Sequence, residues 1–417
     1  MAIDNKDKKV LKSSIEREQN EVACSAECEK IKGSKNLNVP PLRFPEFSGE
    51  WKCTTIGNIG DIKNGPFGSV LHAEDYVENG IPIVTTEHFK TGLMPSDKFG
   101  IPQVSNEDYI RLKGYRLETN DIVFSRVGSV DINAHVGIEQ NGWLFSGRVL
   151  RVRPKYDIDS LFLHYALSTE AVKRDIRNRA VGQTMPSINT PILSSTTIQL
   201  PKDLFEQKKV AHFLRLLDER IITQNKIIED LKKLKSAISE RLFKGIEGSF
   251  VLLSDICDIV KGKQINGENL SESGNYYVMN GGTEPSGYYG DYNVDANAIS
   301  ISEGGNSCGY VQFNTSPFWS GGHCYSIQNI ADNVNNLYLY HYLKSNEDVI
   351  MKLRIGSGLP NIQKKDLAMF KIKVPAIEQQ ITISTFLSSL ERKAEIEERI
   401  QNAMLKEKQY LLHQMFI

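Results

Sequence analysis

Two long segments, residues 204–247 and 377–417, carry apolar residues at steps of three and four, the spacing of one helix face. We therefore predict a long helix in each segment. The residues of this apolar seam are Leu214, Leu217, Ile221, Ile228, Leu231, Ile238, Leu242, Leu387, Leu390, Ala394, Met404, Leu411 and Met415. Because such a seam needs a partner, we expect the two helices to form an antiparallel pair. The alternative is that each helix packs on its own globular domain.

Polar residues interrupt both seams. They are Gln224 and Lys235 in the first helix, and Glu397, Gln401 and Lys408 in the second. Polar residues at such positions occur in helix pairs and also in ordinary core helices, so they do not decide between the two interpretations.

Both helices belong to a longer internal repeat. At a shift of 174 residues, Gly182 and Pro186 coincide with Gly356 and Pro360, and the match continues through a short apolar run. One residue of slippage later, the first helix coincides with the second. Further matched pairs are Ile188 and Ile362, Leu193 and Leu367, Pro201 and Pro375, Gln207 and Gln380, and Phe243 and Phe416. The repeat thus predicts a turn, a strand and a long helix, formed twice.

The segments before each repeat also match, but only at their edges. Residues 56–65 match 253–262 at a shift of 197, and residues 161–168 match 337–344 at a shift of 176. The second domain is therefore 21 residues shorter in its interior. Matching edges around different interiors predict two domains that address different targets, although free drift of surface loops gives the same pattern.

The interiors alternate strand-like runs with glycine-rich turns. The runs are IPIVTT, DIVFSRV and VLRVR in the first domain, and YYVMN, AISIS and YVQF in the second. We expect each domain to be a twisted mixed sheet with a few helices.

These patterns divide the chain into five segments. Residues 1–39, rich in charged and polar residues, are expected to be a mobile extension. The other segments are a first domain at 40–203, a central helix at 204–247, a second domain at 248–376 and a C-terminal helix at 377–417.

Composition narrows the class of protein. The chain has 417 residues, 40% of them hydrophobic, which suits two or three domains. It has no apolar run of 18 residues and no signal-peptide pattern, so we expect a cytoplasmic location. The six cysteines include no CxxC pair and are expected to be reduced thiols.

Local charge departs from the net charge of −1. Residues 146–180 and 344–373 each carry a net charge of +4, and both stretches adjoin the repeated Gly/Pro turn. Basic residues beside glycine-rich loops suit a phosphate backbone. A solvated helix face is the competing interpretation.

Motifs for catalysis are missing from the sequence. It contains no phosphate-binding P-loop, nucleophile elbow, HExxH motif or amino-methyltransferase motif, and its Gly-Gly pairs lack the helix that a dinucleotide site requires. Cys308, His323 and Cys324 do not have the spacing of a zinc site. His88, His135 and His164 have no evident acid-base partner. We expect neither a catalytic nor a metal site.

The repeated GQTMPSI turn, the strand ending in proline, and EQKKVAHFL opening a long helix resemble the specificity subunits of type I restriction-modification systems. The resemblance covers residues 40–417. It implies an α+β fold in which two mixed α/β target-recognition domains are separated by two long antiparallel helices, a coiled coil with pseudo-two-fold symmetry. Each domain would read one half of a bipartite double-stranded DNA site.

The resemblance also implies the partners. They are two modification subunits, which methylate adenine with S-adenosylmethionine, and restriction subunits that use ATP and Mg; the chain itself would bind no cofactor. The candidate DNA-binding residues are Lys63, Asn64, Thr85, Thr86, His88, Arg126, Arg148, Lys173, Arg174, Arg177, Gln183, Lys261, Lys263, Gln264, Asn280, Thr283, Asn306, His323, Lys352, Arg354, Lys364 and Lys365.

Two other functions fit the same pattern. One is a specificity-like subunit of a methyltransferase-only or phage-exclusion system, which only the neighbouring subunits would distinguish. The other is a coiled-coil scaffold whose domains bind protein, which a duplex-binding assay would distinguish.

Overall fold

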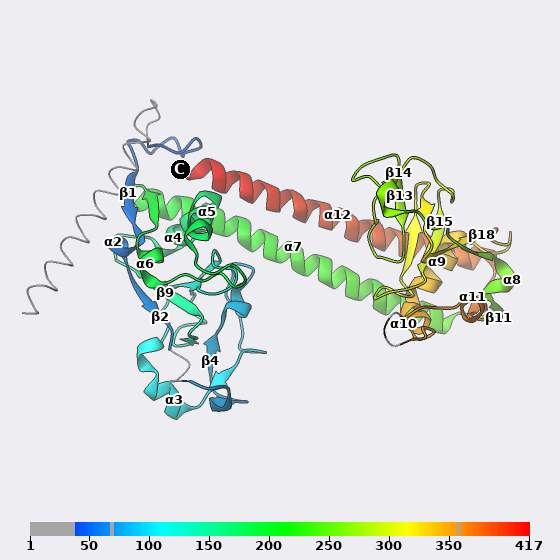
Figure 1. The fold of residues 1–417 in the computed structure, drawn as a ribbon, viewed down its shortest axis with the longest axis horizontal. Helices are drawn as coiled ribbons and strands as arrows, with labels where there is room; N and C mark the ends of the chain where they lie inside the picture. Colours follow the sequence, from blue (N-terminus) through cyan, green and yellow to red (C-terminus); the bar gives the residue numbers. More distant parts are fainter. Residues whose placement is uncertain (1–37, 67–70, 357, 359) are drawn as a thin grey trace, which may run out of the picture. The chain divides into compact units, whose positions relative to one another are not determined.

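The computed structural model describes residues 38–66, 71–356, 358 and 360–417. The extension predicted over 1–39 lies outside the described residues except for its last two positions. The chain forms two compact units. Unit 1 extends to Ile222 and also contains Asn402–Ile417, and unit 2 is Thr223–Gln401. Each unit therefore includes a part of both long helices (Figure 1).

Unit 1 contains three small sheets. The outermost strands of the first domain, β1 and β10, pair antiparallel, and a four-stranded antiparallel sheet has the order β2-β9-β6-β7. A further sheet has the order β3-β5-β4-β8, with β4 parallel to β8. The strands are β1 (Lys52–Thr55), β2 (Gly60–Asn64), β3 (Tyr76–Val77), β4 (Ile81–Val84), β5 (Gln103–Val104), β6 (Ile122–Ser125), β7 (Asn133–His135), β8 (Leu144–Phe145), β9 (Val149–Pro154) and β10 (Thr197–Leu200).

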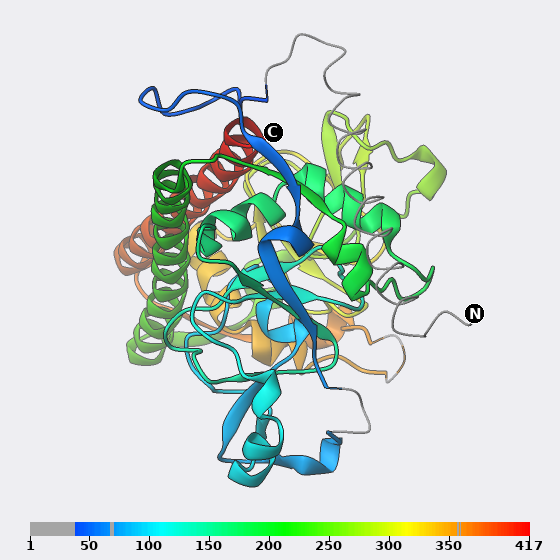
Figure 2. The same cartoon turned by 90° about the vertical axis from the view of Figure 1, so that its left-hand side faces the viewer.

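Several short helices lie between these strands in the chain, and one long helix follows β10. They are α2 (Ile56–Ile59), η1 (Ala73–Asp75), η2 (Thr86–Phe89), α3 (Asn106–Arg111), η3 (Lys113–Tyr115), α4 (Ser160–Leu167), α5 (Glu170–Arg179), α6 (Thr190–Ser194) and α7 (Leu204–Gly245). Figure 2 shows the end of α12 (Ile377–Met415) beside the start of α7.

Unit 2 repeats this plan with fewer elements. Strands β11 and β19 pair antiparallel, the main sheet has the order β12-β18-β15-β16, and the small sheet β14-β13-β17 contains one parallel pair. The elements are β11 (Ser249–Leu252), α8 (Leu253–Ile256), β12 (Asp258–Lys261), η4 (Gly267–Asn269), β13 (Tyr276–Met279), β14 (Tyr288–Tyr289), β15 (Ala298–Ser302), β16 (Val311–Asn314), β17 (Trp319–Ser320), β18 (Cys324–Gln328), α9 (Asn336–Ser345), α10 (Glu347–Met351), α11 (Lys364–Ala368) and β19 (Lys371–Val374).

The six predicted strand runs are all strands. The central strand β9 of the first main sheet lies between β2 and β6, as β18 lies between β12 and β15 in the second. The predicted difference in the interiors is therefore confined to what is inserted between shared strands. Unit 1 has η2, β5, α3 and η3 between β4 and β6, whereas the described residues of unit 2 form only β14 between β13 and β15.

A buried glutamine joins each long helix to its domain, which explains the matched Gln207 and Gln380. The amide of Gln207 donates to the Pro201 carbonyl (3.0 Å) and accepts the Asp159 N–H (2.9 Å). Asp159 in turn caps α4, because its carboxylate accepts the Phe162 N–H at 2.8 Å. One side chain thus joins the end of a strand, the start of α4 and the start of α7.

Gln380 makes the same connections in unit 2. Its amide donates to the carbonyls of Pro375 (2.8 Å) and Asn333 (2.9 Å) and accepts the Asn335 N–H (2.8 Å). Asn335 caps α9 by accepting the Tyr338 N–H at 2.9 Å.

The predicted seam is the packed face of both helices. Leu214, Ile221, Ile228, Leu387, Met404, Leu411 and Met415 are buried. Leu217, Leu231, Ile238, Leu242, Leu390 and Ala394 are half-buried. Both interpretations of the seam hold, because the helices contact one another in each unit and also enter the domain cores, as Leu214 and Met415 do in unit 1.

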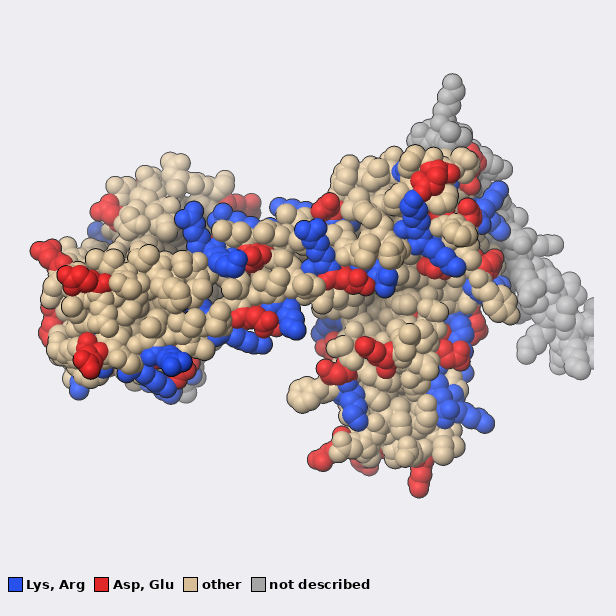
Figure 3. All heavy atoms as spheres, turned by 180° about the vertical axis from the view of Figure 1, so that it is seen from behind, with Lys and Arg blue, Asp and Glu red and all other residues tan. Residues whose placement is uncertain are grey.

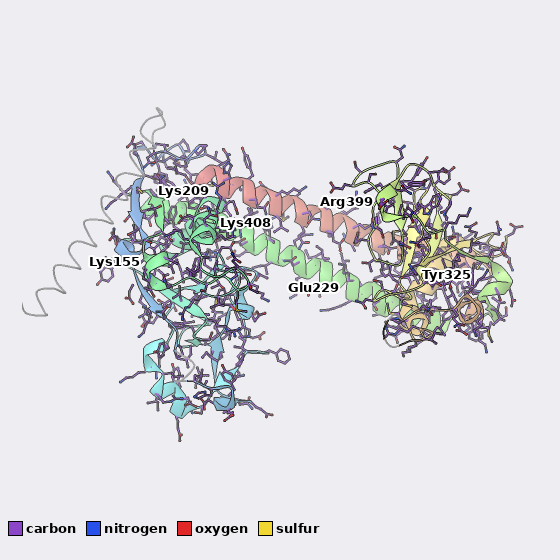
Figure 4. The ribbon with its side chains drawn as sticks, in the orientation of Figure 1. Lys155, Lys209, Glu229, Tyr325, Arg399 and Lys408 are labelled. Carbon is purple, nitrogen blue, oxygen red and sulfur yellow. The ribbon has the colours of Figure 1, made fainter. Side chains whose placement is uncertain are left out.

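Four of the five polar interruptions bond to the opposite helix. In unit 2, Gln224 donates to the Glu397 carboxylate at 2.7 Å, and Lys235 lies 2.6 Å from Glu391. Residue numbers rise along one helix as they fall along the other, which confirms the antiparallel pairing. In unit 1, Lys408, labelled in Figure 4, pairs with a carboxylate of α7 at 2.5 Å.

That carboxylate belongs to Asp218. At the helix shift of 173, Asp218 coincides with Glu391, and Lys235 coincides with Lys408. The two ion pairs are therefore one repeated pair with the helix roles exchanged. Gln224 coincides with Glu397, so these two are each other's counterparts in the repeat. These four interruptions thus follow from the duplication, whereas Gln401 coincides with Ile228.

Candidate nucleic-acid interface

The basic stretch of unit 1 is largely neutralised by carboxylates. Arg151, only 6% exposed in its side chain, pairs with Asp61, and Arg153 is held by Asp121 at 2.7 Å. Neither carboxylate belongs to the stretch 146–180. The local charge of +4 therefore overstates the positive charge that this surface presents.

Two arginines of α5 are engaged in the same way. Arg177 pairs with Asp131 and Glu170, and these hydrogen bonds raise the pKa of its guanidinium. Arg179 pairs with Asp175. Arg177, a candidate for phosphate contact, would have to exchange two carboxylates for the phosphate. Arg174 on the same helix is exposed and Lys173 is half-buried.

The charged surface is mixed on the face that Figure 3 shows. Lys and Arg alternate with Asp and Glu over both units, with large areas of other residues between them. This view shows no continuous basic face. Local groups of side chains at the ends of the sheets are therefore the better candidates for contact with nucleic acid.

One such group lies where β6 ends in unit 1. The residue after this strand, Arg126, donates its N–H to the Arg148 carbonyl (3.0 Å) and accepts the N–H of Ile188 (2.9 Å). Two residues further, the Gly128 N–H bonds to the Pro186 carbonyl at 2.8 Å. The repeated Gly/Pro turn is therefore held against the strand end by backbone hydrogen bonds.

The same hydrogen bonds occur where β15 ends in unit 2. Glu303 donates its N–H to the His323 carbonyl (2.9 Å) and accepts the N–H of Ile362 (2.8 Å). The Gly305 N–H bonds to the Pro360 carbonyl at 3.0 Å. We call this shared backbone arrangement the strand-end node, formed in unit 1 around Arg126 and in unit 2 around Glu303.

Each node also needs a glycine directly after another strand of the same sheet, β2 in unit 1 and β12 in unit 2. A Cβ added to Gly65 would lie 1.9 Å from the Ser146 carbonyl oxygen, and one added to Gly262 would lie 2.2 Å from that of Gly321. Only glycine permits so close an approach of two backbones. The matched glycines of the sequence repeat are therefore explained by packing at the node.

The side chains at the centre differ in charge between the nodes. In unit 1, Arg126 donates to the Gly147 carbonyl at 3.1 Å. In unit 2, the Glu303 carboxylate accepts hydrogen bonds from Lys261 (2.6 Å) and from the hydroxyl of Tyr325 (3.1 Å), which Figure 4 labels in the main sheet. Burial and this carboxylate raise the pKa of Tyr325, which stays a neutral donor.

Buried polar atoms without a hydrogen-bond partner gather at both nodes. Among the described residues they include Asn64 Oδ1, Ser125 Oγ and Ser146 Oγ in unit 1, and Glu303 Oε2 in unit 2. Such atoms cost stability unless a water or a ligand completes their hydrogen bonding.

The structure brings several predicted residues together at the nodes. In unit 2, Lys261 and His323 lie beside Glu303, and the Asn280 side chain accepts the backbone N–H of His323 at 3.0 Å. In unit 1, Asn64 and Arg148 lie at or beside the node. The three Gly-Gly pairs of the second domain also meet here, since Gly281, Gly304 and Gly322 border His323 or Gln264.

Other candidates lie elsewhere. Thr85 and His88 bond to one another, the Thr85 N–H donating to His88 Nδ1 at 3.0 Å, and burial lowers the pKa of His88. Lys63 lies over the ring of Tyr115 at 5.2 Å. Among all candidates, those at the nodes included, the exposed ones are Arg148, Arg174, Gln183, Lys261, Lys263, Gln264, Thr283, Asn306, His323, Lys352, Arg354, Lys364 and Lys365, and Thr86 is half-buried.

Sequence reasoning missed Glu303. Its structural counterpart in unit 1 is Arg126. Both residues lie inside the domain interiors, which differ in length and show no sequence match. A glutamate after a strand gives no signal by itself, and only the shared hydrogen bonds reveal the equivalence.

His164, His135 and Cys324 have structural roles. His164 is buried, bonds to Asn133 at 2.7 Å, and burial lowers its pKa to about 3. His135 bonds to Ser160 at 2.8 Å. Burial raises the pKa of the Cys324 thiol to about 11. Among the residues that the structure describes, no three His, Cys, Asp or Glu side chains form a metal-binding group.

The fold and the nodes define a duplicated recognition protein, in which one backbone frame presents two different sets of polar side chains. The model of the type I restriction modification DNA specificity domain matches residues 48–233 and again residues 247–406. The chain therefore belongs to this family.

Relatives of known description agree with this assignment. A type I restriction enzyme specificity subunit of Methanocaldococcus jannaschii (MjaX) is 26% identical over 91% of this chain and 96% of its own length. A type I specificity subunit of Mycoplasma pneumoniae is 30% identical over 68% of this chain and 72% of its own.

Solved structures support the fold. The S subunit of a type I restriction-modification system from M. genitalium has a TM-score of 0.63 at 19% identity, covering 91% of this chain and 99% of that one. A chain from a study of complex assembly and conformational transition of the type I system has a TM-score of 0.55 at 16% identity, covering 89% and 98%. Within the described residues, no helix is long and apolar enough to span a membrane.

Proposed function

We propose that this chain is the DNA-reading subunit of a type I restriction-modification complex, in which unit 1 reads one half of a bipartite site and unit 2 reads the other. The observation that carries this proposal is the strand-end node. The same backbone hydrogen bonds are formed around Arg126 and around Glu303, so a common scaffold holds opposite charges. Two readers of different sequences need such a scaffold.

The chain directs chemistry that its partners perform. Two modification subunits would methylate adenine with S-adenosylmethionine, and restriction subunits would use ATP and Mg. The buried histidines and thiols described above serve packing, which fits a subunit that recognises DNA and leaves catalysis to others.

Exposed apolar residues on the long helices support docking of two such partners. Phe213 on α7 and Phe386 on α12 coincide at the helix shift of 173, and they are 40% and 46% exposed. Paired positions of this kind, one in each unit, suit two copies of one modification subunit. Exposed aromatic residues are typical anchors of protein interfaces.

The test is the pattern of methylated adenines when this chain is expressed with the modification subunits. Long-read sequencing should show a bipartite site that disappears without this chain. Replacing the interior from Gly65 to Leu161 with that of a related protein should change one half-site only. A methylation pattern that ignores the chain, or a replacement that changes both halves, would contradict the proposal. The purified chain alone should neither methylate nor cleave DNA.

The scaffold alternative makes a different prediction. A protein-binding scaffold would leave duplex binding by the modification subunits unchanged, whereas a DNA reader makes that binding sequence-dependent. A methyltransferase-only or phage-exclusion system would show the same methylated site without restriction, so challenge with unmodified DNA distinguishes it.

A further inference from the structure

The strand-end node of unit 2 contains a buried carboxylate oxygen that lacks a hydrogen bond. Glu303 is 8% exposed, and its Oε1 accepts the hydrogen bonds from Lys261 and Tyr325. Its Oε2 has no hydrogen-bond partner. A buried carboxylate accepts several hydrogen bonds when they are offered, so half of this group's capacity is unused.

The imidazole of His323 lies beside this oxygen. Nδ1 of His323 lies 3.9 Å from Glu303 Oε2, too far for a hydrogen bond, and the His323 side chain is 64% exposed. His323 therefore lies over Glu303 without being fixed to it through its ring.

Open space lies beside His323 at two glycines. A Cβ added to Gly305 would meet no described heavy atom within 4 Å, and one added to Gly304 would come no closer than 3.6 Å to the Pro360 carbonyl oxygen. Gly304 and Gly305 follow Glu303 directly. Glycines at such a place allow a flat ligand edge to approach the backbone closely.

The charge of Glu303 decides which ligand edge fits. A phosphate is repelled by a carboxylate, and so is a base edge made only of acceptors. A hydrogen-bond donor is attracted. In DNA, the major-groove donors are the amino groups at N4 of cytosine and N6 of adenine.

We propose that Glu303 is a specificity-determining residue, an inference that rests on the proposed function. Its free carboxylate oxygen selects a base that carries an exocyclic amino group in the half-site read by unit 2. Arg126 holds the equivalent position in unit 1 and has only donors, so the unit 1 node lacks this preference. Lys261 and Tyr325 position the carboxylate, and His323 covers it in the absence of DNA.

The experiment uses the complete modification complex with wild-type chain, Glu303→Gln and His323→Ala. A library of duplexes randomised in both half-sites is methylated, and the products are sequenced. In wild type, one position of one half-site should favour cytosine or adenine, and the library itself distinguishes the two. In Glu303→Gln, this preference should fall roughly tenfold, because one good contact to a base contributes about 1–3 kcal/mol of discrimination.

The second variant covers the case in which Glu303→Gln fails to fold. His323 is exposed, so His323→Ala should fold, and removal of the cover should strengthen the preference at the same position. Glu272→Gln, an exposed carboxylate of unit 2, is the matched control and should leave every position unchanged.

Three results would overturn the proposal. They are an unchanged preference in folded Glu303→Gln, a uniform loss over all sequences, which would assign Glu303 to folding alone, and an unchanged preference in His323→Ala. If the wild-type complex itself lacked a bipartite preference, the proposed function would fail first. A wild-type preference that all variants keep leaves the proposed function intact and removes only the role of Glu303.

Discussion

Unit 1 and unit 2 hold the Gly/Pro turn against a strand end with the same hydrogen bonds, yet the central side chain is Arg126 in one and Glu303 in the other. The long helices show the opposite case, because Asp218 and Glu391 keep both their charge and their lysine partner. Where the duplicated parts pack on each other, the chemistry is kept. At the strand ends the charge of the central side chain diverges, which is what separate recognition of two half-sites requires.

The largest change in stability is expected when a buried ion pair of unit 1 is broken. Glu206 is buried, with a side chain that is 2% exposed, and it accepts hydrogen bonds from Arg43 and Trp51. Arg43→Ala would leave this carboxylate buried without its cation, so unfolding of unit 1 should become easier by about 3 kcal/mol. Urea denaturation followed by hydrogen exchange measures this unit by unit.

The control is the matching position of the second helix. At the shift of 173, Glu206 coincides with Gln379, which is exposed. Gln379→Ala should change the free energy of unfolding by less than about 0.5 kcal/mol. Equal effects of the two substitutions would show that Arg43 has no special role.

The next effect concerns the glutamines that both units share. Gln380→Leu should cost about 3 kcal/mol, because two carbonyls and one N–H lose their buried partner. Gln207→Leu should cost less, about 2 kcal/mol, since only one carbonyl and one N–H depend on it. Urea denaturation of both variants gives the comparison, and a larger cost for Gln207→Leu would contradict it.

The buried histidines should make the stability of each unit depend on pH. Burial lowers the pKa of His341 to about 4, so the folded state binds fewer protons than the unfolded state, whose histidine titrates near about 6.5. Stability is then lost as pH falls below about 6.5, by about 2 kcal/mol between pH 7 and pH 5. His164, with a pKa of about 3, should contribute a similar loss in unit 1.

Unfolding free energies at pH 7 and pH 5 test this. His341→Gln should remove the pH dependence from unit 2 and leave that of unit 1, because Gln is uncharged and can still reach Ser388, the present partner of His341 at 2.8 Å. An unchanged pH dependence of unit 2 would mean that another group is responsible.

The smallest effect is on DNA affinity. Arg174 is exposed, so Arg174→Ala should lower the dependence of log K on log salt by roughly 0.9 if it contacts one phosphate. Arg177→Ala should lower it less, because Arg177 already pairs with Asp131 and Glu170. Binding of the modification complex to duplex DNA at several salt concentrations measures both slopes. A change of target bases would instead place Arg174 at a base.

Sequence reasoning reached the fold through the repeat. The matched Gln207 and Gln380 and the matched Gly182 and Gly356 gave the order of turn, strand and helix, and the heptad-like steps gave the seam. The polar interruptions left the helix pair open, although Lys235 and Lys408 coincide at the same shift as the rest of the helices. Their coincidence was a signal in the sequence, because a duplicated antiparallel pair places each lysine opposite the copy of one acid.

The charge of the candidate site depended on tertiary structure. Arg151 and Arg177 were counted as free positive charges, but Asp61 and Asp131, distant in sequence, lie beside them. Periodicity is a local property of the chain and is visible in the sequence. Strand pairing between distant residues decides which carboxylate neutralises which arginine. It also places Glu303 in unit 2 at the position that Arg126 holds in unit 1. Only the folded chain determines these arrangements.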